Sequence, residues 1–142
     1  MIKQIFLLTL FSSFMCASMD SFAKKNNYFV DYKKALESSK ITKKPLMLLV
    51  VTNTCPWCEK LQKQTLRKNI IHNYISTNFT PLILNRDKDQ YPIKKFVAKV
   101  VPTVFFINSD DEQSIDVSYG YKSHKKFIKV LQNAISKHKE KS

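Results

Sequence analysis

Glycine is nearly absent from this chain, which has one glycine in 142 residues. Phosphate-binding loops of the G-x-G-x-x-G and Walker types need several glycines, and neither pattern is present. The sequence also shows no internal repeat and no low-complexity segment. Nucleotide binding through a glycine-rich loop and repeat architectures are therefore excluded, and the length is that of one domain.

Acidic residues are scarce as well, with 11 Asp and Glu against 24 Lys and Arg and a formal net charge of +13. The lysines are spread along the chain without a dense basic block or the aromatic motifs of nucleic-acid-binding proteins. We interpret the charge as a solvated basic surface and expect no nucleic-acid partner. The alternative is attraction to acidic partners or to anionic lipid headgroups, which would give a peripheral membrane contact.

The N-terminus has the pattern of an export signal. Lys3 precedes an apolar stretch at residues 5–15, which is shorter than the roughly 20 residues of a membrane span. Ser21 and Ala23 supply the small residues that a signal peptidase reads. The sequence predicts a signal peptide at residues 1–23, cleaved after Ala23, and one domain at residues 24–142. The alternative is an uncleaved N-terminal membrane anchor.

Cysteine is also rare, and its placement is informative. Loss of Cys16 with the signal leaves Cys55 and Cys58, within the sequence Cys55-Pro56-Trp57-Cys58 directly after an apolar run at residues 45–51. Two thiols at this spacing can close and reopen a small disulfide ring, and an oxidising compartment permits that bond. A thiol at a helix N-terminus is stabilised as the thiolate and becomes a nucleophile.

The predicted elements follow the order of an α/β domain. Apolar runs predict strands at residues 46–51, 79–84 and 103–107, and residues 114–119 alternate as a hairpin partner. Capping residues and helical spacing predict helices after Asp31, from Pro56, from Asn69, near residues 93–98 and after Ser123. Strands separated by helices imply parallel pairing. We expect a mixed sheet of four to five strands with helices on both faces.

The chain resembles the thioredoxin-fold family over about residues 28–137. In particular it is similar to exported bacterial thioredoxin-like proteins and to the soluble thiol-carrying domain of thiol:disulfide interchange proteins. The resemblance implies a thioredoxin fold, a periplasmic location and no cofactor beyond a redox-active Cys55–Cys58 disulfide. Four segments carry it: Lys44-Pro45-Leu46, Cys55-Pro56-Trp57-Cys58, Val101-Pro102-Thr103 and Gly120-Tyr121-Lys122-Ser123.

The same resemblance implies roles for single residues. Cys55, exposed at the mouth of the helix, is the nucleophile, and the more buried Cys58 resolves the mixed disulfide. Pro102 is a cis proline that exposes the backbone of Val101 to an extended substrate, and Trp57 either offers that substrate an apolar plate or packs against the fold. The implied activity is thiol:disulfide oxidoreductase. The expected partners are cysteine-containing exported proteins and a membrane electron donor of the thiol:disulfide interchange type.

Two positions depart from the family pattern. Leu49 stands six residues before Cys55, where thioredoxins carry a buried acid that accepts the proton of the resolving thiol. Glu59 follows Cys58, but a neighbouring residue need not face the thiol. Trp57 stands where strong oxidants have a histidine that stabilises the thiolate. We therefore expect the reductase or isomerase direction.

Two rival interpretations use the same residues. The cysteine pair could bind Cu(I) or half a zinc site, although zinc normally needs four ligands and the chain's three histidines, His72, His124 and His138, are not at helpful spacing. We therefore predict no metal site. The second rival is a substrate-binding or chaperone module that uses the groove at Val101 and Pro102 without turnover.

Overall fold

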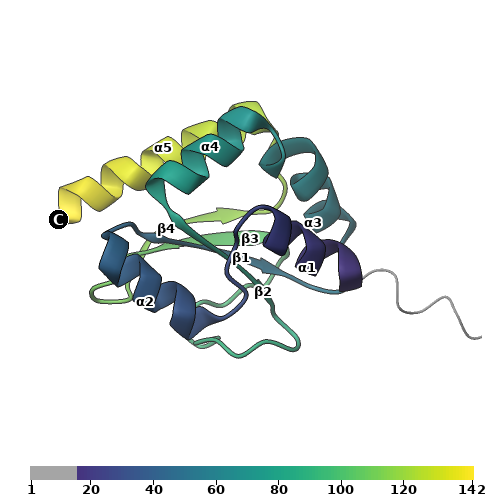
Figure 1. The fold of residues 1–142 in the computed structure, drawn as a ribbon, viewed down its shortest axis with the longest axis horizontal. Helices are drawn as coiled ribbons and strands as arrows, with labels where there is room; N and C mark the ends of the chain where they lie inside the picture. The colour runs from purple at the N-terminus through teal and green to yellow at the C-terminus, as the bar shows by residue number, and fades with distance from the viewer. Residues whose placement is uncertain (1–15) are drawn as a thin grey trace, which may run out of the picture.

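The computed structural model describes residues 16–142, with side chains from residue 19 onward. Figure 1 shows a central sheet between helices. In chain order the elements are α1 (Cys16–Lys25), α2 (Tyr32–Thr42), β1 (Leu46–Val51), α3 (Pro56–Leu61), the π-helical segment η1 (Gln62–Leu66), α4 (Asn69–Asn78), β2 (Thr80–Asn85), β3 (Thr103–Ile107), β4 (Ser114–Tyr119) and α5 (His124–Lys141).

The sheet has the strand order β2-β1-β3-β4. β1 pairs with β2 in parallel, as expected, whereas β3 is antiparallel to both β1 and β4. The mixed four-stranded sheet is confirmed. In place of a fifth strand, Phe29 forms a single parallel bridge beside β2: its N–H donates to the Pro81 carbonyl at 2.9 Å, and its carbonyl accepts from the Ile83 N–H at 2.9 Å.

The predicted helix near residues 93–98 is wrong. A single turn forms there, in which the Phe96 N–H donates to the Pro92 carbonyl at 3.0 Å. Beyond it residues 97–102 form neither a helix nor a strand; Phe96 and Ala98 are buried there, and Val97 between them is exposed. The two buried side chains anchor this loop, and Val101, directly before Pro102, is disfavoured in a helix. Because no crossover helix carries the chain back along the sheet, β3 starts at the end of the sheet where β2 finishes. β3 therefore runs antiparallel to β1 and β2.

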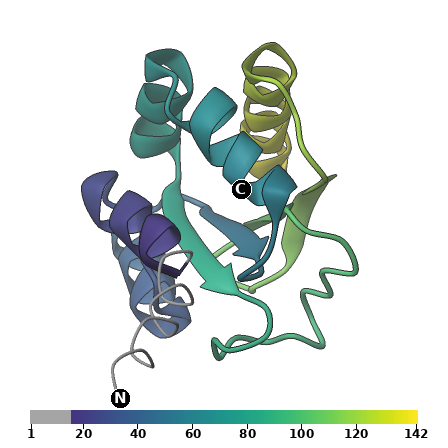
Figure 2. The ribbon, with the colours of Figure 1, turned by 90° about the vertical axis from the view of Figure 1, so that its right-hand side faces the viewer.

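The residues of β1 alternate between two cores. Met47, Leu49 and Val51 pack into a core with α3, α4 and α5. Leu46, Leu48 and Val50 pack on the other face, beneath α2. Figures 1 and 2 show these helices on opposite sides of the sheet, which confirms the predicted layers. Because a strand buried on both faces needs apolar side chains throughout, the continuous run at residues 46–51 is explained.

The N-terminal helix α1 overlaps in sequence with the predicted signal peptide. Residues 1–15 of that segment lie outside the described residues. Phe22 and Ala23 are 2% and 1% exposed, and the Phe22 ring meets Tyr28 edge-on at 5.3 Å between centroids. Cleavage after Ala23 would remove Phe22 from this core, and both the signal and its cleavage stay predictions. Across residues 16–142, no helix has the length and apolar character needed to cross a membrane.

Candidate active site

The cysteine pair lies at the carboxyl end of β1. A polar turn at residues 52–54 follows the strand, and Cys55 is the N-cap of α3 with extended backbone angles. Pro56 occupies the first helical turn, where a missing N–H costs nothing. Val50 pairs with Thr103, so the start of β3, and with it Pro102, lies at the same end of the sheet. Figure 2 faces this end of the molecule.

Cys55 and Cys58 form a disulfide with an S–S distance of 2.08 Å and a Cα–Cα distance of 5.2 Å. The Cys55 Sγ also accepts a hydrogen bond from the Cys58 backbone N–H at 3.1 Å. The amide would stabilise a thiolate at Sγ once the bond is reduced. Cys55 is 8% exposed and Cys58 4%, so the order of burial is as predicted. The prediction of an exposed Cys55 is wrong for the disulfide form, in which the Cys55 sulfur is bonded to that of Cys58.

Trp57 is half-exposed beside the pair. The residue is 55% exposed, and its ring lies 5.9 Å from the Tyr121 ring, centroid to centroid. The Lys60 ammonium sits 4.9 Å from the Trp57 centroid and 4.8 Å from that of Tyr121. Contacts of this kind between a cation and two rings hold the indole in place. Trp57 therefore packs on one side and keeps an apolar surface open to solvent on the other.

The peptide bond between Val101 and Pro102 is cis, as the resemblance implied. Pro102 is buried, and its carbonyl accepts a hydrogen bond from the Gly120 N–H at 2.8 Å. Val101 is half-buried and packs against both cores, one of which contains the two cysteines. The structure thus brings the segment at Val101 and the disulfide to one end of the fold.

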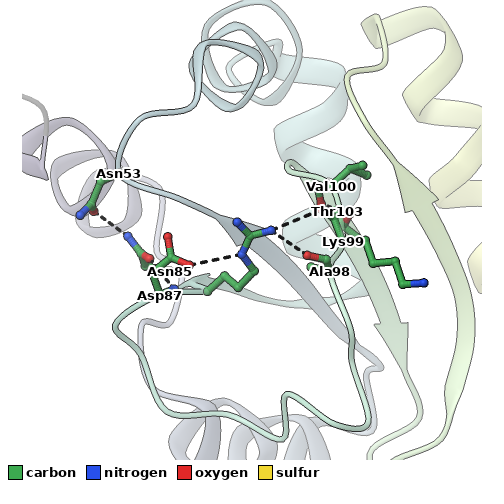
Figure 3. Close-up of polar contacts among 8 residues, drawn as sticks. Asn53, Asn85, Asp87, Ala98, Lys99, Val100 and Thr103 are labelled. Atoms are coloured by element: carbon green, nitrogen blue, oxygen red, sulfur yellow. Dashed lines mark hydrogen bonds and ion pairs between the residues drawn. The ribbon is translucent and has the colours of Figure 1, made fainter.

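Sequence reasoning missed a polar network that ties the loops of this end together (Figure 3). Asn85, the last residue of β2, donates from Nδ2 to Asn53 Oδ1 at 2.6 Å, within the turn before Cys55. Arg86 donates from Nη1 to the Ala98 carbonyl at 2.9 Å. The sequence feature that could have indicated this network is the pair Asn85-Arg86 at the end of a buried strand. These residues fix the turn before the cysteines and the loop before the cis proline.

Removing the Arg86 guanidinium should loosen the loop at residues 98–101. We expect Arg86→Met, which keeps the aliphatic stem, to cost about 1.5–3 kcal/mol of unfolding free energy, the usual worth of a hydrogen bond to a charged group. The kcat/KM for disulfide exchange should fall more than kcat, because the loop borders the site without touching the sulfurs. Urea unfolding and insulin reduction measure both, with Lys94→Met, an exposed lysine of the same loop, as control. An Arg86→Met protein matching that control in stability would contradict this role.

The position of the family's buried acid is apolar. Leu49 is 1% exposed, and its neighbours across the sheet are Ile83 and Val104. Glu59 is half-exposed and forms an ion pair with Lys63, so it is directed to solvent. The structure therefore places no carboxylate at the family's acidic position.

Metal-ligating side chains are not clustered near the pair. Within residues 16–142, no group of three or more His, Cys, Asp or Glu residues is arranged to hold a metal ion.

A dithiol that caps a helix after a central strand, with a cis proline at the same end of the sheet, defines the thioredoxin class of fold. The family model of the thioredoxin-like domain matches residues 32–135. The chain therefore belongs to the thioredoxin-like family, and its cysteine pair makes it a thiol–disulfide oxidoreductase. No curated protein matches its sequence.

Solved structures share this fold at low identity. A putative disulphide-isomerase from Bacteroides thetaiotaomicron is 21% identical, with 75% of this chain and 88% of that one covered and a TM-score of 0.66. The oxidised C-terminal domain of DsbD from Neisseria meningitidis is 19% identical, with 75% and 98% covered and a TM-score of 0.62. A DsbH oxidoreductase is 18% identical, with 76% and 83% covered and a TM-score of 0.65.

Proposed function

We propose that this protein is an exported thiol:disulfide oxidoreductase that works in the reductase or isomerase direction on cysteine-containing exported proteins. The observation that carries the direction is the environment of Cys55. The Cys55 sulfur accepts one hydrogen bond, from the Cys58 backbone N–H. Trp57 occupies the position where a charged histidine would stabilise the Cys55 thiolate more strongly. A less stabilised thiolate makes the reduced form less favourable, and this lowers the reduction potential.

The partners follow from the same site. The open face of Trp57 and the backbone of Val101 suit an extended segment of a protein that carries a cysteine. The fold shared with the DsbD C-terminal domain supports a membrane electron donor of the thiol:disulfide interchange type. The apolar stretch at residues 5–15 and the small residues before Lys24 support export to the periplasm. The net charge of +13 supports peripheral contact with anionic lipid.

The direction is tested by the reduction potential of the purified protein in glutathione buffers. We expect a value between about −270 and −180 mV, the range of thioredoxins and isomerases. Trp57→His should move the potential toward the oxidising end, because an imidazole can stabilise the Cys55 thiolate. A wild-type potential near −120 mV, that of a strong oxidant, would overturn the proposed direction.

A further inference from the structure

A buried glutamine lies one helical turn after the resolving cysteine. Gln62 is 2% exposed, and its Oε1 has no hydrogen-bond donor among the described residues. A buried carbonyl oxygen without a donor costs about 1–3 kcal/mol, so a natural protein seldom keeps one without a use. Neither the fold nor the proposed exchange at Cys55 and Cys58 gives this amide oxygen a role.

The helix geometry places Gln62 on the same face as Cys58. The Gln62 backbone N–H donates to the Cys58 carbonyl, so the two residues are in α-helical i, i+4 register. Side chains at that spacing share a face, with Cβ atoms about 5–6 Å apart, and a long side chain leans toward the helix N-terminus. The buried residues of this segment form one inward stripe: Cys58, Leu61, Gln62, Thr65 and Leu66.

The other side chains of this stripe are less well placed to accept from Cys58. Leu61 and Leu66 are apolar, and Thr65, whose hydroxyl donates to the Lys122 carbonyl at 2.7 Å, follows Cys58 by about two helical turns. Leu49, at the position of the family's acid, offers no oxygen. In the disulfide form the Cys58 sulfur carries no proton, so the glutamine oxygen has nothing to accept from it.

We propose that Gln62 is a positioning residue for the redox step: its Oε1 accepts a hydrogen bond from the Cys58 thiol of the reduced protein. Reduction by a dithiol breaks the Cys55–Cys58 bond, transfers two electrons to the pair and leaves a proton on the Cys58 sulfur. The new S–H then satisfies the amide oxygen. Gln62 thereby stabilises the reduced form relative to the disulfide and raises the reduction potential. The amide does not take up the proton, which leaves Cys58 when the disulfide closes again.

The test is the equilibrium of the full-length protein with glutathione, measured by trapping free thiols. Gln62→Met keeps an unbranched side chain of similar size and removes the strong acceptor. We expect the disulfide form to become favoured by about tenfold, the worth of one such hydrogen bond, which is about 30 mV for a two-electron couple. The matched control is Gln132→Met, the same change at an exposed position of α5, which should leave the equilibrium unchanged.

A second readout separates this role from simple packing. Urea unfolding of both redox forms should show that Gln62→Met destabilises the reduced form more than the disulfide form. Gln62→Glu keeps an acceptor oxygen and should not shift the equilibrium toward the disulfide. Gln62→Leu repeats the test if the methionine variant does not fold. Equal destabilisation of both forms, or a glutathione equilibrium within about twofold of the control, would overturn the proposal.

The inference rests on exchange at the Cys55–Cys58 pair and is independent of the proposed direction. The test compares the glutathione equilibrium of one variant with that of another, so its outcome does not depend on the potential of the wild-type protein. A strongly oxidising wild-type protein would overturn the reductase direction and leave the comparison between Gln62→Met and its control intact.

Discussion

Cys55→Ser is expected to lower disulfide exchange by about a thousandfold or more, because a serine hydroxyl is not ionised at neutral pH and cannot replace the thiolate. In the mechanism that we propose for the intact protein, the Cys55 thiolate attacks a substrate disulfide and releases one substrate thiolate. The Cys58 thiol then loses its proton, and its sulfur attacks Cys55 Sγ. This closes the Cys55–Cys58 bond, releases the second substrate thiolate and moves two electrons to the substrate.

Cys58→Ser should give a different result, since attack is retained and resolution is lost. Mixed disulfides through Cys55 should accumulate, and mass spectrometry of the trapped species would identify the substrates. Insulin reduction with a dithiol reductant measures turnover for both variants. Cys16→Ser is the matched control and should keep wild-type turnover. Full turnover by Cys55→Ser, or the absence of Cys55 adducts in Cys58→Ser, would contradict the mechanism.

The second large effect is expected on stability. Leu49→Asp places a carboxyl at a position that is 1% exposed, between Ile83 and Val104 on the neighbouring strands. Burial raises the pKa of such a carboxyl, and we expect a loss of about 4 kcal/mol at neutral pH. That loss is a large share of the roughly 5–15 kcal/mol that stabilises a typical domain.

The pH dependence of this loss has a definite sign. With a raised pKa, the folded protein holds the proton more tightly than the unfolded chain does. The variant should therefore approach the stability of Leu49→Asn at acid pH and lose stability as the pH rises above about 3.9, the ordinary aspartate value. Urea unfolding of variant and wild type at each pH measures this difference. Leu49→Asn is the uncharged control, and its deficit should not change with pH. A Leu49→Asp protein as stable as wild type at pH 7 would show that this site tolerates the family's acid.

Much of the fold could be predicted because its signals are local. The continuous apolar run at β1 and the alternation in β4 gave strands with correct bounds, and Asp31 caps α2 as expected, with its carboxylate accepting the Lys34 N–H at 2.9 Å. Ser123 also stands at the N-cap of α5, although its side chain makes no capping hydrogen bond. The stretch after Pro92 was predicted as a helix from its apolar spacing, whereas the structure has a single turn and then a loop there, with the buried Phe96 ring against Tyr32 of α2.

The amino-acid sequence by itself determined the reactive pair, because two thiols with two residues between them can close a small disulfide ring in an oxidising compartment. It also determined that the surroundings differ from thioredoxin, since leucine at position 49 carries no proton acceptor in any fold. Tertiary structure decided the rest. Residues far apart in the chain make the Arg86 contact to the Ala98 carbonyl and bury Gln62. Local sequence does not encode such contacts, since they depend on which strands pair and which loops meet at one end of the sheet.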